Sequence, residues 1–100
     1  MLQIFNNKDS KIILENTSPQ KNIDMINEHI NLCNCRNMTI DISKLNIIDA
    51  CMVSTVCSTT HYLKYPDGKI SWITNSDEVE EYTKPTNLGN SFFTKKIAYQ

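Results

Sequence analysis

The stretch TIDISKLNIIDACMVSTVC, residues 39–57, changes its hydrophobic period partway along. Apolar and polar residues alternate over 38–43, which is typical of a strand. From Asp49 onward apolar residues recur at spacings of three and four, which is typical of a helix. That stripe consists of Val53, Val56, Cys57, Thr60 and Leu63. The stretch therefore predicts a strand, a short loop and a helix with Asp49 as its N-cap.

The residues before this stretch extend the alternation of strands and helices. The turn-forming stretch NNKDS, residues 6–10, lies between two short apolar runs and predicts a β-hairpin over about residues 2–15. Ser18 suits an N-cap and Pro19 suits the first position of a helix. The apolar face of that helix consists of Ile23, Ile26 and Ile30.

The residues after the stretch predict a further strand and helix. YPDG at 65–68 ends the preceding helix, and the β-branched segment 69–75 is typical of a buried parallel strand. Ser76 can cap a short helix that Pro85 limits, and the tail from Phe92 onward predicts an edge strand. We expect one domain over 1–100 in the order β-β-α-β-α-β-α-(β). The predicted class is α/β, a mixed sheet of four to five strands with helices packed against it, or α+β if the hairpin dominates.

The composition excludes several classes of protein. A net charge of −1 gives no basic surface for nucleic acid. The chain has no apolar run long enough to cross a membrane, and its start lacks the pattern of a signal peptide. Two of the four cysteines, Cys51 and Cys57, fall on the predicted helix, which suits reduced thiols. We therefore expect a cytoplasmic protein, and no residue pattern indicates a cofactor.

Residues 39–93 resemble the second half of a STAS domain, the fold of bacterial anti-sigma factor antagonists and sulfate transporter tails. Asp41-Ile-Ser43 resembles the strand motif of that family, and Asp49 matches the aspartate of its Asp-Ser-Ser-Gly loop. GKISWITNSDEVEEY and NLGNSFF, from Gly68 and from Asn87, resemble the later strand, helix and closing region. The resemblance implies a STAS-like fold and a non-enzymatic, regulatory protein-binding role.

In the antagonists of that family, a partner kinase phosphorylates the second serine of the loop, and this chain has Ala50 and Cys51 at the two serine positions. The resemblance therefore implies a docking surface without the phosphoryl switch, for an anti-sigma factor, a kinase-like protein or another regulatory partner. The implied docking surface continues along the exposed face of the helix to Leu63. The predicted partner-binding residues are Asn46, Ile48, Asp49, Ala50, Cys51, Met52 and Val53. An exposed edge strand at either terminus also leaves pairing as a homodimer open.

Other candidate sites compete with this interpretation. Ser54 and Thr55 are candidate phosphoacceptors near the helix start. Cys51 in a first helical turn is a candidate low-pKa thiol for redox sensing. Nucleophilic catalysis by Cys51 would also need a base and an oxyanion site, which the sequence does not indicate. His29, Cys33 and Cys35 are weak candidates for a metal site, which would need a fourth ligand. We expect no enzyme and no bound metal, and the alternative is a redox or metal-linked sensor.

Overall fold

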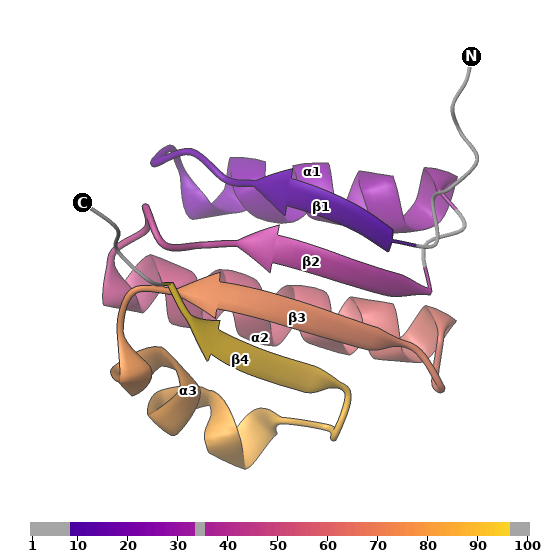
Figure 1. Cartoon of the computed structure of the whole chain (residues 1–100). Coiled ribbons are helices and arrows are strands. Elements are labelled where there is room, and N and C mark those ends of the chain that lie inside the picture. Colours follow the sequence, from indigo (N-terminus) through magenta and orange to yellow (C-terminus); the bar gives the residue numbers. More distant parts are fainter. Residues whose placement is uncertain (1–8, 34–35, 97–100) are drawn as a thin grey trace.

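The computed structural model describes residues 9–33 and 36–96, in which strands and helices alternate along the chain (Figure 1). The elements are β1 (Asp9–Ile13), α1 (Pro19–Leu32), β2 (Asn37–Asp41), α2 (Ile47–Lys64), β3 (Lys69–Thr74), α3 (Asp77–Thr83), the 3-10 turn η1 (Lys84–Thr86) and β4 (Ser91–Lys95). The predicted α/β class is confirmed.

The four strands form one sheet in the order β1-β2-β3-β4, and each neighbouring pair is parallel. Ile40 lies opposite Ile12 on one side and Trp72 on the other, and Trp72 lies opposite Phe93. Each strand is thus joined to its neighbour by a crossover that contains a helix. The long helices α1 and α2 lie behind the sheet in Figure 1, and both α1 and α3 contact α2.

The expectation of a mixed sheet is not met among the described residues, where all pairings are parallel. It depended on a hairpin over about residues 2–15. Asp9 and Ser10, which were expected in its turn, instead belong to β1 and pair with β2. The first strand of the hairpin lies outside the described residues.

The helix termini follow local sequence signals in two cases. Ser18 caps α1 by accepting a hydrogen bond from the Lys21 amide, and Pro19 is the first helical residue, as predicted. Ser76 caps α3 by accepting from the Glu78 amide, also as predicted. Both hydroxyls satisfy amides that the helix itself leaves unpaired.

The core lies between the sheet and its helices. Trp72 of β3 is fully buried, as are Ile40 of β2 and Ile70 of β3. The apolar face predicted for α1, with Ile26 and Ile30 fully buried, packs against them. This burial of large aliphatic and aromatic side chains is the main stabilising contribution to the fold.

The buried face of α2 differs from the predicted stripe. Val53 and Cys57 are fully buried as expected, but Val56 and Leu63 are exposed. The residues that face the core are Ala50, Val53, Ser54, Cys57, Ser58 and His61. The prediction failed because three of these six side chains are polar, while several apolar residues of α2 point outward.

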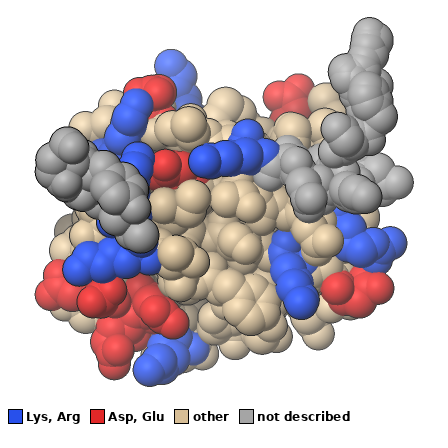
Figure 2. All heavy atoms as spheres, in the orientation of Figure 1, with Lys and Arg blue, Asp and Glu red and all other residues tan. Residues whose placement is uncertain are grey.

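The side of the sheet that faces away from α1 and α2 is not covered by any described helix. Figure 2 views this face, and uncharged residues occupy its middle while most charged side chains lie towards its margin. Thr39, Ser71 and Phe92 are neighbours across β2, β3 and β4. They alternate with the buried residues of each strand and so point to this face.

The helix α2 ends at the YPDG sequence, as predicted, and the connection to β3 shows why. Tyr65 is the C-cap of α2, and the amide of Gly68 donates to the Tyr65 carbonyl at 2.9 Å. A Cβ atom on Gly68 would collide with the Arg36 carbonyl oxygen. Glycine is therefore required here by the close approach of two backbone segments.

Candidate functional site

The loop between β2 and α2 begins with a buried carboxylate. Asp41 Oδ1 accepts hydrogen bonds from the Ser43 amide at 2.9 Å and from Ser43 Oγ at 2.6 Å. Lys96 Nζ lies 3.3 Å from Asp41 Oδ2. Burial by itself would raise the pKa of Asp41, but these donors outweigh it and lower the pKa below its ordinary value. These hydrogen bonds therefore fix the start of the loop to the charged carboxylate of Asp41.

Asn46, not Asp49, is the N-cap of α2, so the predicted cap was wrong. The helix begins at Ile47, and Asn46 Oδ1 accepts from the Asp49 amide at 2.8 Å. Asn46 Nδ2 in turn lies 3.4 Å from Asp49 Oδ2. This pair differs from a capping box, because the Asp49 carboxylate accepts from the side-chain amide of Asn46 and not from its backbone amide.

The seven predicted binding residues divide into two sets. Ala50 and Val53 are buried in the core and cannot contact a partner directly. Cys51 and Asp49 are half-buried. The accessible part of the predicted surface is thus carried by Asn46, Ile48, Asp49, Cys51 and Met52. Ile48 is the most accessible apolar residue among them, with 74% of its surface exposed.

An open groove of about 570 Å³ runs beside this helix start. Its lining residues are Leu45, Asn46, Ile47, Ile48, Asp49, Asn75 and Ser76. The groove lies where β2 and β3 end, and ligands of α/β proteins commonly bind outside the carboxyl ends of parallel strands. Asn75 Nδ2 donates to the Ser43 carbonyl at 2.8 Å and so joins the two loops of the groove.

Sequence reasoning missed Asn75 and Ser76 as part of this site. Both follow β3 directly, as residues 42–46 follow β2. Because β2 and β3 are parallel neighbours, their following loops meet at one edge of the sheet. The parallel pairing was expected for 69–75, so this signal was present in the sequence.

The thiols of α2 are held in their protonated form. Burial raises the pKa of the Cys51 thiol above its ordinary value. Burial also raises the pKa of Cys57, to about 12. A reactive cysteine needs the opposite shift, because the thiolate is the nucleophile. His61, further along α2, is fully buried and packs its ring against Tyr65 with centroids 5.4 Å apart.

The candidate metal ligands are only partly described. His29 Nδ1 and Cys33 Sγ lie 3.6 Å apart at the end of α1, while Cys35 is outside the described residues. Burial lowers the pKa of His29. Within residues 9–33 and 36–96, no three His, Cys, Asp or Glu side chains are grouped closely enough to hold a metal ion. A metal site formed by His29, Cys33 and Cys35 together therefore stays a prediction.

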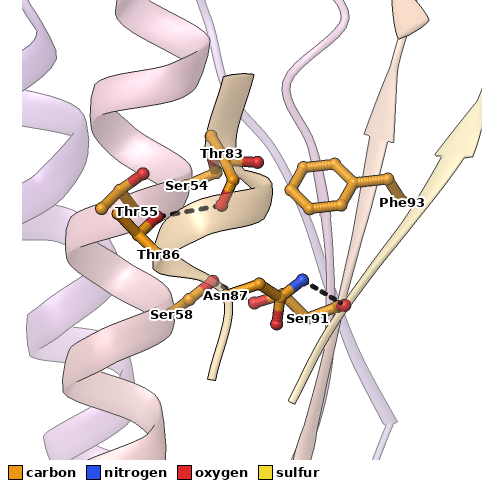
Figure 3. Close-up of a pocket in the computed structure, with 8 residues that line it drawn as sticks. All are labelled: Ser54, Thr55, Ser58, Thr83, Thr86, Asn87, Ser91 and Phe93. Atoms are coloured by element: carbon orange, nitrogen blue, oxygen red, sulfur yellow. Dashed lines mark hydrogen bonds between the residues drawn. The ribbon is translucent and has the colours of Figure 1, made fainter. Parts of the chain in front are cut away.

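Hydroxyl groups line a small pocket between α2, the α3–η1 segment and β4 (Figure 3). The lining residues are Ser54, Thr55, Ser58, Thr83, Thr86, Asn87, Ser91 and Phe93. The enclosed space is about 10 Å³, roughly the size needed by one water molecule. Ser54 is 1% exposed and its Oγ donates to the Cys51 carbonyl at 3.2 Å. A phosphoryl group on Ser54 would therefore require this part of the fold to open.

No family model, curated protein or solved structure matches the chain. Of the helices in the part of the chain that the structure describes, none is both long and apolar enough to cross a membrane.

Proposed function

We propose that this chain is a cytoplasmic, non-enzymatic protein-docking module with a STAS-like role. Its docking surface is the groove at the carboxyl ends of β2 and β3 together with the accessible start of α2. The observation that carries the proposal is the placement of Ile48, an apolar side chain 74% exposed in the wall of that groove. Ile48 lines the groove together with Leu45 and Ile47, and a contiguous apolar surface rimmed by polar residues is typical of an interaction site.

The polar residues of the groove are suited to orienting a partner. Asn46 and Asp49 are held by their mutual hydrogen bonds, and Asn75 is held by the Ser43 carbonyl. Groups fixed in this way lose little side-chain entropy when a partner binds. The combination gives an apolar contact at Ile48 with polar contacts of fixed geometry around it.

A docking role without a phosphoryl switch fits the chemistry at the helix start. Ala50 and Cys51 stand where the resembled family has serines, and Ser54 is buried. The raised pKa of Cys51 gives no support to thiol catalysis or redox sensing at the same place. Stoichiometric phosphate on Thr55, mapped by mass spectrometry after incubation with ATP and cell extract, would contradict the absence of a switch.

The docking surface is tested by introducing a photo-crosslinking amino acid at position 48 of the full chain in living cells. We expect a discrete crosslinked adduct from position 48. The matched control carries the same crosslinker at Tyr82 of α3, which is also well exposed, and is expected to give none. The mass of the adduct tells whether the partner is another protein or a second copy. Absence of any adduct from position 48 would overturn the proposal.

A further inference from the structure

The side of α2 that points away from the sheet is an apolar stripe, which we call the outer stripe: Ile48, Met52, Val56 and Leu63. Ile48 and Leu63, at its two ends, are 74% and 76% exposed, and Met52 and Val56 between them are 45% and 39% exposed. With about 100° of rotation per residue, these four positions fall within about 80° of the helix circumference. They therefore lie on one face of the helix, with Thr59 between Val56 and Leu63 on the same face.

The outer stripe lies on a long uncharged segment of α2. Between Asp49 and Lys64 the sequence contains no Asp, Glu, Lys or Arg. By contrast, the exposed face of α1 carries Lys21 and Glu28 among its charges, and α3 begins with acidic residues. Depletion of charged residues together with exposed Met and aliphatic side chains is typical of the centre of a protein interface.

We propose that the outer stripe binds the same stripe of a second copy of this chain, with the two α2 helices antiparallel. This inference deepens and rests on the proposed docking function, because it names one partner of that surface. In an antiparallel pair centred on Val56, Ile48 of one copy faces Leu63 of the other at both ends. Met52 then faces Thr59, and Val56 lies near its own counterpart. Such a self-complementary arrangement is the requirement of a two-fold symmetric interface.

The charges at the two ends of the helix favour the antiparallel direction. The spacing of Asp49 and Lys64 places both on the same flank of the outer stripe. Antiparallel packing about a two-fold axis therefore brings Asp49 of each copy beside Lys64 of the other. In a parallel two-fold pair the same flanks lie on opposite sides of the interface, so neither charge meets an opposite charge. Lys64 Nζ is held at this flank by the Asn31 carbonyl, 3.2 Å away. Opposite charges at the rim of an interface fix its register and direction.

The first test is the mass of the full chain in solution by sedimentation velocity across a concentration series. We expect a reversible dimer, and we expect Val56→Glu to raise its dissociation constant roughly 100-fold, because the charge would be buried against its own counterpart. Tyr82→Glu is the matched control, since Tyr82 is exposed on α3 outside the stripe. Circular dichroism checks that the variants fold.

The second test fixes the direction of packing by disulfide crosslinking, with Cys33, Cys35 and Cys51 replaced by alanine. Under mild oxidation we expect Val56→Cys to form a covalent dimer and Leu63→Cys alone to form none. The double variant Ile48→Cys, Leu63→Cys should link readily. A native chain that stays monomeric, or a crosslink from Leu63→Cys alone, overturns this inference. The docking proposal fails on a different result, the absence of any adduct from position 48.

Discussion

Trp72 Nε1 donates a 3.0 Å hydrogen bond to Ser58 Oγ, which joins the central strand β3 to the buried face of α2. Ser91 Oγ lies 2.6 Å from the same hydroxyl, and Asn90 Nδ2 donates to the Ser58 carbonyl at 3.1 Å. Ser58 thus satisfies polar groups of both β3 and the segment leading into β4. In a core this small, such a network also fixes which side of α2 faces the sheet.

Replacing Ser58 by alanine should lower the free energy of unfolding by about 2–6 kcal/mol. The change leaves the indole N–H of Trp72 and the hydroxyl of Ser91 without their buried partner, and each unmet group costs about 1–3 kcal/mol. Urea denaturation monitored by Trp72 fluorescence measures the loss. Thr59→Ala is the control, because Thr59 is exposed and its Oγ1 bonds only the Thr55 carbonyl one turn earlier. Equal stability of the two variants would contradict this role of Ser58.

The same residues explain why the face of α2 was predicted incorrectly. Hydrophobic periodicity assumes that buried positions are apolar. Ser54, Ser58 and His61 are buried polar residues, while Val56 and Leu63 are exposed, so the apolar spacing identified a stripe that straddles the two faces. Only the partners supplied by distant segments, such as Trp72, reveal that a serine belongs in the core, and a sequence does not show those partners.

Capping residues predicted the helix termini more reliably than apolar spacing predicted the buried face of α2. Ser18 and Ser76 cap their helices as predicted because a cap depends on residues two or three positions away. Asn46 was passed over in favour of Asp49, although asparagine is an equally good cap. The accessibility expected of Ala50 and Val53 was wrong, because both side chains are buried, and the binding role of the other predicted residues stays a prediction.

The corrected cap gives a second prediction. Asn46→Ala should lower the free energy of unfolding by about 1 kcal/mol, because the Asp49 amide loses its acceptor. Asp49→Ala should cost less, since the amide of residue 49 keeps its bond to Asn46 Oδ1. Denaturant midpoints of the two variants make the comparison. A larger loss from Asp49→Ala would show that Asp49 is the dominant cap after all.

The cysteines give a third prediction, which bears on the redox alternative. At pH 8 we expect iodoacetamide to leave Cys57 unmodified in the folded protein, because Cys57 is fully buried and its pKa is raised to about 12. Cys51 should react more slowly than a free thiol, since burial raises its pKa as well. Peptide mass spectrometry follows the modification of each cysteine, and unfolding in urea should make both thiols react. Rapid labelling of Cys51 at neutral pH would revive the sensor hypothesis.

The buried carboxylate of Asp41 predicts how stability depends on pH. Its pKa is lowered in the folded protein, because the donors Ser43 and Lys96 outweigh the effect of burial. The unfolded chain therefore takes up the proton first as the pH falls. The stability that Asp41 contributes is present above its ordinary pKa of about 4 and is lost as the pH falls through the lower folded value.

Asp41→Asn should accordingly cost about 1.5–3 kcal/mol at neutral pH, the range for hydrogen bonds to a charged group. The difference from the native chain should shrink as the pH falls below the ordinary pKa of about 4 and on through the lower folded value, where the native carboxylate also becomes neutral. Urea unfolding at each pH measures it. Ser43→Ala removes one donor at 2.6 Å and should reduce the pH-dependent part while leaving the Lys96 contact in place. A difference between the native chain and Asp41→Asn that stays constant over this range would mean that the folded protein does not stabilise the charged form.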